Sequence, residues 1–156
     1  MGTLPTQSAS MCAEPCVQIA RAMNSETEAL KARTKRFALD VLRFVRELPV
    51  NDECRDIGGQ LRRSASGVGA NYRATCRSRS RPEFIARVSV ALEEADESAF
   101  WLEVIAEGGL SSDRQALQLL DEANQLCAIL AASAITAGEA QRRGDPDPRA
   151  RRQNRR

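Results

Sequence analysis

The stretch that decides the fold runs from Leu61 to Trp101 and reads LRRSASGVGANYRATCRSRSRPEFIARVSVALEEADESAFW. It holds two helical patterns, joined by an arginine-rich turn at residues 77–81. The first pattern predicts a helix over residues 52–78 whose bulky apolar stripe has small residues on both flanks. Small flanks allow neighbouring helices to approach closely, so this helix is expected at the centre of the fold. The alternative is a break near Gly67 and Gly69, because each glycine costs up to ~1 kcal/mol in a helix interior.

Three further helices are predicted outward from this stretch. Each begins at a capping box, in which a serine is followed three residues later by Glu or Gln: Ser25 with Glu28, Ser80 with Glu83, and Ser112 with Gln115. Apolar residues recur at three- and four-residue steps after each box, which predicts helices over residues 25–48, 82–107 and 113–137. Pro49, the glycine pair at 108–109 and Gly138 are the predicted stops.

Four helices of similar length with short connections predict an all-α fold, an antiparallel up-down-up-down four-helix bundle over residues 25–138. Residues 1–24 are expected to form a disordered leader. Residues 139–156 are expected to form a disordered basic tail, because they contain almost nothing apolar. The sequence contains neither a membrane-spanning run nor a secretory signal pattern, so the expected location is the cytoplasm.

Positive charge is concentrated in two places. The chain carries a formal net charge of +2, although the tail alone holds seven Arg and three acidic residues. The second concentration is an arginine cluster, predicted at one end of the central hairpin: Arg62, Arg63, Arg73, Arg77, Arg79 and Arg81. Such a patch would bind nucleic-acid phosphates without reading sequence. The equally weighted alternative is that these arginines pair with acids on later helices and face solvent.

The composition argues against catalysis. There is no His, so neither a Ser-His pair nor a ferritin-like Glu-x-x-His site is possible. We therefore predict no catalytic residue, metal or cofactor, and interpret the acidic run at 93–97 as a solvated helix face. Four polar residues are predicted to form a structural seam, with Asn71 bonded across it and Glu94 paired to Arg63 or Arg87: Ser64, Asn71, Glu94 and Glu97. Trp101 and Ile105 are the predicted subunit contact.

Several ordered motifs resemble one bacterial family of four-helix-bundle proteins, over about residues 28–136: Leu61–Tyr72, Cys76–Ser80, Glu83–Ile85, Leu92–Ser98 and Trp101–Glu103. The family includes proteins encoded by intervening sequences of large-subunit ribosomal RNA genes, and it is similar to the accessory variability proteins of diversity-generating retroelements. The matching motif positions are Arg63, Ser64, Asn71, Arg77, Arg79, Glu94 and Glu97. The chain departs from many members at Gly58-Gly59 and at Arg73-Ala74-Thr75, where an acid is lost and a base gained.

The resemblance implies a ring-shaped homopentamer without established enzyme activity. In the retroelement relatives, a basic pentamer contacts a reverse transcriptase and nucleic acid. The expected function is therefore a non-catalytic oligomeric bundle whose arginine-rich surface binds RNA or DNA, or a nucleic-acid enzyme such as a reverse transcriptase. The alternative is a protein–protein interaction scaffold with no nucleic-acid role.

Overall fold

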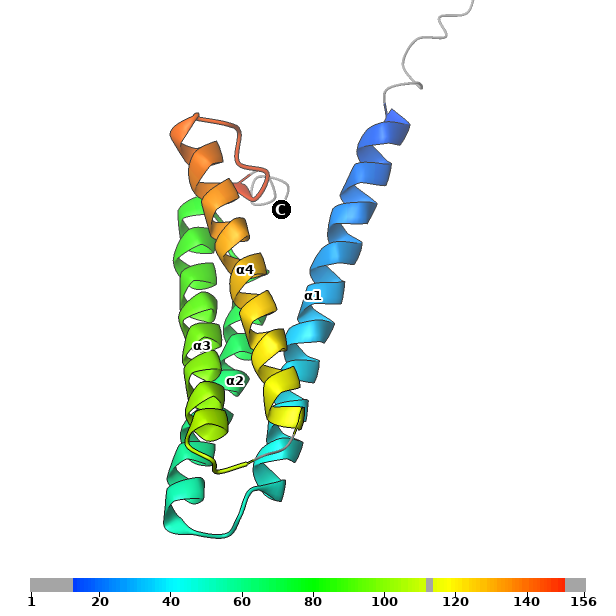
Figure 1. Cartoon of the computed structure of the whole chain (residues 1–156). Coiled ribbons are helices and arrows are strands. Elements are labelled where there is room, and N and C mark those ends of the chain that lie inside the picture. The colour runs from blue at the N-terminus through cyan, green and yellow to red at the C-terminus, as the bar shows by residue number, and fades with distance from the viewer. Residues whose placement is uncertain (1–12, 112–113, 151–156) are drawn as a thin grey trace, which may run out of the picture.

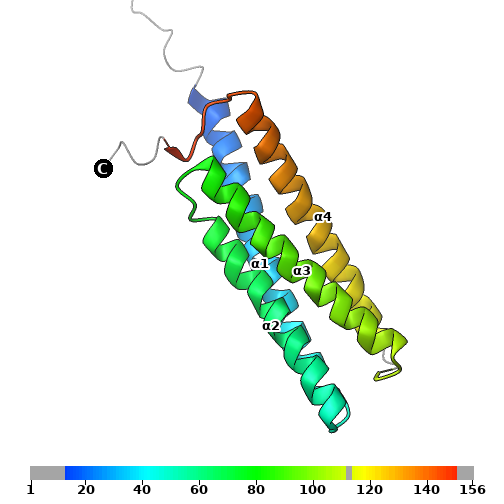
Figure 2. The same cartoon turned by 90° about the vertical axis from the view of Figure 1, so that its left-hand side faces the viewer.

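The computed structural model describes residues 13–111 and 114–150, with side chains from Ser25 onward. Its four helices are α1 (Ala13–Glu47), α2 (Asp52–Thr75), α3 (Arg81–Glu107) and α4 (Arg114–Arg142). Consecutive helices run antiparallel and pack in sequence order, as Figures 1 and 2 show. The predicted all-α class and up-down bundle are confirmed.

Helix α2 is unbroken, and three of its glycines lie against neighbouring helices. A Cβ on Gly58 would lie 2.8 Å from Cγ1 of Val45 on α1, and one on Gly69 would lie 3.5 Å from the backbone oxygen of Thr34. On the opposite flank, a Cβ on Gly67 would overlap the carboxyl group of Glu94 on α3. The predicted close packing of α2 against two neighbours is confirmed, but α2 is not the central helix, because α3 packs at least as extensively against α2 and α4. This tertiary packing offsets the cost of the helical glycines.

The core lies along the bundle axis and is built mainly from aliphatic residues and alanine. Leu61 and Val68 of α2 are fully buried, together with Val88 and Leu102 of α3. Phe37 and Phe44 of α1 close one side. Burial of one such side chain contributes about 1.5–3 kcal/mol. The N-terminus of α3 is capped as the sequence predicts, with Ser80 accepting the Glu83 N–H (3.3 Å). At the N-terminus of α2, Asn51 accepts the Cys54 N–H (2.7 Å).

Helix α1 begins earlier than predicted. It starts at Ala13, so Ser25 lies inside the helix, and Glu28 pairs with Lys31 (2.6 Å) rather than closing a capping box. A cap stabilises a helix only at its terminus, where backbone N–H groups have no partner within the helix. Because residues 13–24 are helical, Ser25 is not at a terminus. The expectation of a disordered leader is wrong for residues 13–24, and residues 1–12 lie outside the described part of the chain.

Helix α4 ends later than predicted. It passes through Gly138 and closes only at Gly144, whose φ of +72° places it in the left-handed region. The Asp145 N–H donates to the Ala140 carbonyl and the Gly144 N–H to the Gln141 carbonyl, which is the Schellman pattern. The tail is therefore helical at its start and ordered as far as residue 150, contrary to the prediction of disorder. The predicted cap at Ser112 falls on residues 112–113, outside the described residues.

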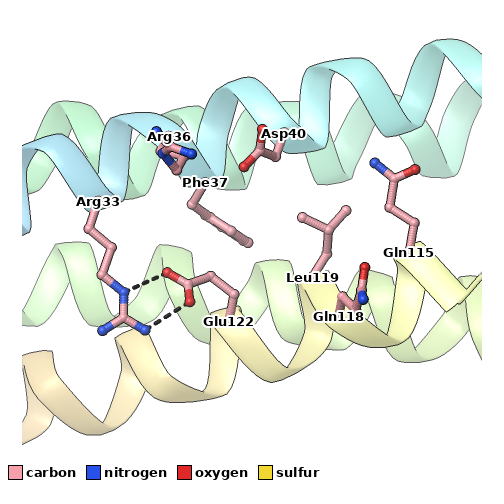
Figure 3. A pocket seen from close by; sticks show the side chains of 8 residues that line it. All are labelled: Arg33, Arg36, Phe37, Asp40, Gln115, Gln118, Leu119 and Glu122. Atoms are coloured by element: carbon pink, nitrogen blue, oxygen red, sulfur yellow. Dashed lines mark hydrogen bonds and ion pairs between the residues drawn. The ribbon is translucent and has the colours of Figure 1, made fainter.

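Helices α1 and α4 are the least closely packed neighbours. The N-terminal half of α1, drawn in blue, diverges from α4 in Figure 1. A hollow of about 400 Å³ lies between the two helices, lined by Arg33, Arg36, Phe37, Asp40, Gln115, Gln118, Leu119 and Glu122. Figure 3 shows that Arg33 crosses it to Glu122. One seam of the bundle is therefore held by long polar side chains instead of close contact.

Candidate nucleic-acid interface

The arginine surface comprises five of the six predicted arginines: Arg62, Arg63, Arg73, Arg77 and Arg79. All five side chains are exposed. Arg62 and Arg73 lie on the same face of α2, because eleven residues make three helical turns plus about 20°. Their separation along the helix axis is about 16 Å. The surface is thus elongated along α2 and the α2–α3 turn, and is not concentrated at the hairpin end as the sequence suggested.

None of these five arginines forms an ion pair with a described residue. Arginines elsewhere do: Arg43 with Asp40, Arg55 with Asp52, and Arg87 with Glu83 at 2.7, 2.7 and 2.9 Å. The sequence left two hypotheses for these arginines, phosphate binding or pairing with acids on α3 and α4. Such pairing is not observed within residues 25–111 and 114–150. Exposed guanidinium groups without an internal partner keep all their donors for an external anion.

Arg81 is different from the other five, because its side chain is 8% exposed and turned into the protein. Its guanidinium group donates to the carbonyl oxygens of Asp145 (2.7 Å) and Pro146 (3.0 Å). Its prediction as a nucleic-acid-binding residue is wrong for this conformation, because the C-terminal tail already occupies its donors. The signal that sequence reasoning missed is long-range: residues 81 and 145 are far apart in the chain.

The α2–α3 turn is rigidified around its exposed arginines. Glu83 accepts the Arg79 N–H at 2.7 Å and also contacts Arg87. The Arg79 N–H is the main cause that lowers the pKa of Glu83, with the Arg87 charge adding to it. Ser78 is buried in the same turn. Residues 77 and 79 are thus presented from a fixed backbone, which reduces the ordering cost of binding a ligand.

The predicted polar seam between α2 and α3 contains a buried serine pair. The Ser98 hydroxyl lies 3.0 Å from Ser64 Oγ and 2.8 Å from the Glu94 carbonyl oxygen, and its one proton is donated to either of these acceptors. Ser64 in turn donates to the carbonyl of Leu61 or Gln60 (both 3.3 Å). Sequence reasoning placed Ser64 in the seam but missed Ser98, which also lies on the inner face of α3.

Two other seam residues do not make the predicted contacts. Glu94 forms no ion pair with Arg63 or Arg87; its carboxyl group lies against Gly67 instead. Burial there raises the pKa of Glu94, and the neighbouring Glu97 and Glu93 raise it further. No described hydrogen bond joins the Asn71 side chain to α3; the recorded contact of this residue is its carbonyl, which accepts from Thr75 Oγ1 (2.8 Å). Glu97 accepts the Trp101 indole N–H (3.0 Å).

Of the two residues predicted as the subunit contact, only Trp101 is accessible at the surface. Ile105 is fully buried in the core, so it cannot touch another subunit, and that prediction is wrong. Trp101 is partly exposed and lies edge-on to Phe100, with ring centroids 4.9 Å apart. Phe100, which sequence reasoning missed, is 52% exposed. An exposed aromatic pair on α3 is the stronger candidate for a contact surface.

The described residues contain no group of three metal-ligating side chains, and no described helix is both long and apolar enough to cross a bilayer. The hollow between α1 and α4 was not predicted. Its Arg33 donates from Nε and Nη2 to the two Glu122 oxygens at 2.7 and 2.8 Å. The hydrogen bond to Glu122 is the main cause that raises the pKa of Arg33. This arginine is bound within the chain, unlike the arginine surface.

Comparison with known proteins gives a family match and a likeness to solved structures. The model of the 23S rRNA-intervening sequence protein family matches residues 26–132. A crystal structure of a protein of unknown function from the S23 ribosomal protein family of Bacteroides thetaiotaomicron VPI-5482 is similar, with a TM-score of 0.58 and 23% identity. The match covers 67% of this chain and 96% of that one, and at this identity it supports the fold alone. The comparison with curated proteins gave no match.

Proposed function

Because this chain belongs to the 23S rRNA-intervening sequence protein family, we propose that it is a non-catalytic helical bundle that binds the phosphate backbone of nucleic acid through its arginine surface. The observation that carries the proposal is that Arg62, Arg63, Arg73, Arg77 and Arg79 are exposed and form no ion pair with described residues. Guanidinium groups bind phosphate with a planar fork of donors. Because no stacking aromatic accompanies them on this surface, the binding is to backbone and not to bases.

In this proposal the protein acts as a homo-oligomer. The family resemblance implies a ring of five chains, and that is the specific assembly we expect. The exposed Phe100 and the adjacent Trp101 are its proposed subunit contact, since aromatic residues are enriched in interfaces. Light scattering at micromolar concentration is expected to give a mass of five chains. Phe100→Ser is expected to lower that mass, whereas Leu117→Ser, a change at another exposed apolar residue, leaves it unchanged.

The nucleic-acid function is tested by measuring the affinity for RNA and for DNA at two salt concentrations. The triple variant Arg73→Ala, Arg77→Ala, Arg79→Ala is expected to lower the affinity by about 10–100-fold and to reduce the logarithmic salt slope by about 2–3. The matched control is Arg43→Ala, Arg55→Ala, Arg87→Ala, which removes the same charge from exposed arginines that are already paired. Equal losses in the two triple variants would show that only net charge matters and would contradict the proposed surface.

The second candidate is a protein-interaction scaffold, and the exposed Phe100 favours it. A nucleic-acid enzyme such as a reverse transcriptase is the class of partner that the family resemblance suggests. Under this reading, wild-type protein binds neither RNA nor DNA even at low salt. A partner would then be captured by the wild-type protein and lost with Phe100→Ser, while the arginine triple variant retains it.

A further inference from the structure

The arginine surface borders the seam between α1 and α2. A Cβ on Gly69 of α2 would lie 3.8 Å from the backbone nitrogen of Lys35, and a Cβ on Gly58 would lie 2.8 Å from Cγ1 of Val45. Because the two helices are antiparallel, these contacts fix their register along the seam. Lys35 is therefore level with Gly69, and Arg46, the residue after Val45, is level with Gly58.

Four cations lie along the solvent side of this seam. On α2, Arg62 and Arg73 each follow a contacting glycine by four residues, which turns them about 40° from α1 toward solvent. On α1, Lys35 and Arg46 each follow a residue that contacts one of those glycines, which turns them about 100° toward solvent. All four side chains are exposed. The seam is thus flanked by positive charge from both helices, and not from α2 alone.

None of these four cations forms an ion pair with a described residue. Two other cations beside the seam are paired within their own helices: Lys31 with Glu28 at 2.6 Å, and Arg55 with Asp52 at 2.7 Å. The contrast selects Lys35 and Arg46 as the α1 residues whose donors are available to an external anion.

The four cations form a straight row, here called the cation row, that alternates between the two helices. Its order along the seam is Arg73, Lys35, Arg62 and Arg46. At 1.5 Å per residue, the row is about 24 Å long and its members are about 8 Å apart. Because two packed helices carry it, the row is rigid and its spacing is fixed before any ligand binds.

A straight row of this length fits an unpaired strand better than a duplex. Each strand of a duplex turns once around the axis in about 34–36 Å, so within the length of the row it winds away from a straight line. An unpaired strand can extend along the whole row. A positively charged groove that follows the backbone is a general means of binding single strands without sequence preference.

We propose that an unpaired strand of nucleic acid lies along the α1–α2 seam, with its phosphates bound by the cation row. The proposal rests on the nucleic-acid function proposed above and deepens it in two ways. It adds Lys35 and Arg46 of α1 to the binding residues, and it names the form of nucleic acid that the surface takes.

The first test removes the α1 half of the row. The double variant Lys35→Ala, Arg46→Ala is expected to lower the affinity for an RNA of about 12 uridines by about 5–20-fold. The logarithmic salt slope should fall by about 1.4, at roughly 0.7 per phosphate contact on a single strand. The control is Arg36→Ala, Arg43→Ala, which removes the same charge from exposed positions of α1 away from the seam; Figure 3 shows Arg36 at the hollow facing α4. It is expected to change the affinity by less than about 2-fold.

The second test places an acid in the middle of the row. Ser66 is exposed on the same edge of α2, between Arg62 and Arg73. Ser66→Glu is expected to lower the affinity for the uridine strand by about 10-fold, because its carboxylate repels the bound phosphates. Gln118→Glu, which adds the same charge at an exposed position of α4, is expected to lower it by less than about 2-fold. Circular dichroism and urea denataturation of all variants establish that the bundle is retained.

The third test compares the unpaired strand with an RNA duplex of the same length. The duplex carries more charge per unit length, so attraction by charge alone would favour it. The cation row is expected to bind the unpaired strand more tightly, by about 5-fold, and the Lys35→Ala, Arg46→Ala variant should lose this preference.

Three outcomes would overturn the proposal: equal losses in the two α1 double variants, equal losses in Ser66→Glu and Gln118→Glu, or duplex binding at least as tight as binding of the unpaired strand. If the triple variant at Arg73, Arg77 and Arg79 still loses affinity in those cases, the cation row fails and the arginine surface stands. Absence of nucleic-acid binding by the wild-type protein at low salt would overturn both.

Discussion

The two sides of the bundle are assembled by opposite means. Helix α2 meets α1 and α3 through glycine, serine and alanine, so backbones lie close and the polar contact is a buried Ser64–Ser98 hydrogen bond. Helices α1 and α4 meet through Arg33 and Glu122 across a hollow. The difference shows that side-chain length sets helix separation here, and that the close side should be sensitive to added volume whereas the open side should be sensitive to salt.

Adding volume on the close side should have the largest effect. Gly58→Leu is expected to lower the free energy of unfolding by about 3 kcal/mol, because even a Cβ at this position would lie 2.8 Å from Val45. The adjacent Gly59→Ala is the control: its Cβ would meet only the ends of two arginine side chains at 3.8 Å. It should raise stability by about 0.5–1 kcal/mol through helix propensity. Urea denaturation measures both, and similar losses in the two variants would contradict the close approach of α1.

Removing the serine pair should have the next largest effect. Ser98→Ala is expected to cost about 1 kcal/mol, since Ser64 loses its cross-helix donor. The double variant Ser64→Ala, Ser98→Ala should cost less than the two single variants together, because no polar group is then left without its partner. A double-mutant cycle by urea denaturation gives the coupling directly. Strict additivity would mean that the two hydroxyls do not interact.

The open side should respond less. Arg33→Ala is expected to cost about 0.5–1 kcal/mol, because the Arg33 and Glu122 side chains are about one third exposed and solvent weakens the pair. The loss should shrink as salt is raised toward 1 M, whereas the cost of Ser98→Ala should not. Thermal denaturation at low and high salt provides the comparison. A salt-independent loss would place the importance of Arg33 in its packing.

The smallest effect is expected at Glu94, where a charge lies on the close side. Its folded pKa is raised, so ionisation opposes folding: the cost is absent below the unfolded pKa and complete above the folded one. Glu94→Gln should therefore stabilise the protein by about 0.5 kcal/mol at pH 7 and lose this advantage as the pH falls below the normal glutamate range. Unfolding measured from pH 3 to 7 tests the sign. Destabilisation at pH 7 would reveal an attractive partner for the carboxylate.

The sequence predicts those features that depend on neighbouring residues. Helix periodicity locates all four helices, Ser80 marks a cap that the structure confirms, and the small flanks of α2 predict its close packing against α1 and α3. The prediction that Ile105 contacts another subunit is wrong, because periodicity alone does not distinguish a core position from a partly exposed position beside it. The predicted ion pair of Glu94 is wrong because its carboxyl group lies against Gly67, and a glycine carries no charge that would mark it in the sequence as a partner.

The position of residues 143–150 could not be predicted for a different reason. Nothing near Arg81 in sequence indicates that residues 145–147 will return to it, and nothing near Gly138 indicates that α4 will continue through that glycine. The arginine surface lies between these cases: five of the six predicted arginines are exposed and Arg81 is buried, while their role in binding nucleic acid stays a prediction. Its elongated shape follows from the spacing of Arg62 and Arg73 along one face of α2.

The direction of residues 145–150 depends on one backbone torsion angle, φ of Gly144. For a residue with a side chain, φ near +72° costs about 1–2 kcal/mol. This cost is comparable to the net contribution of one or two of the hydrogen bonds that Arg81 donates to the carbonyls of Asp145 and Pro146. Any replacement there would favour a chain that continues away from the bundle. A single uncharged substitution at Gly144 would thus weaken the contact of residues 145–147 with Arg81 without changing the net charge of the protein.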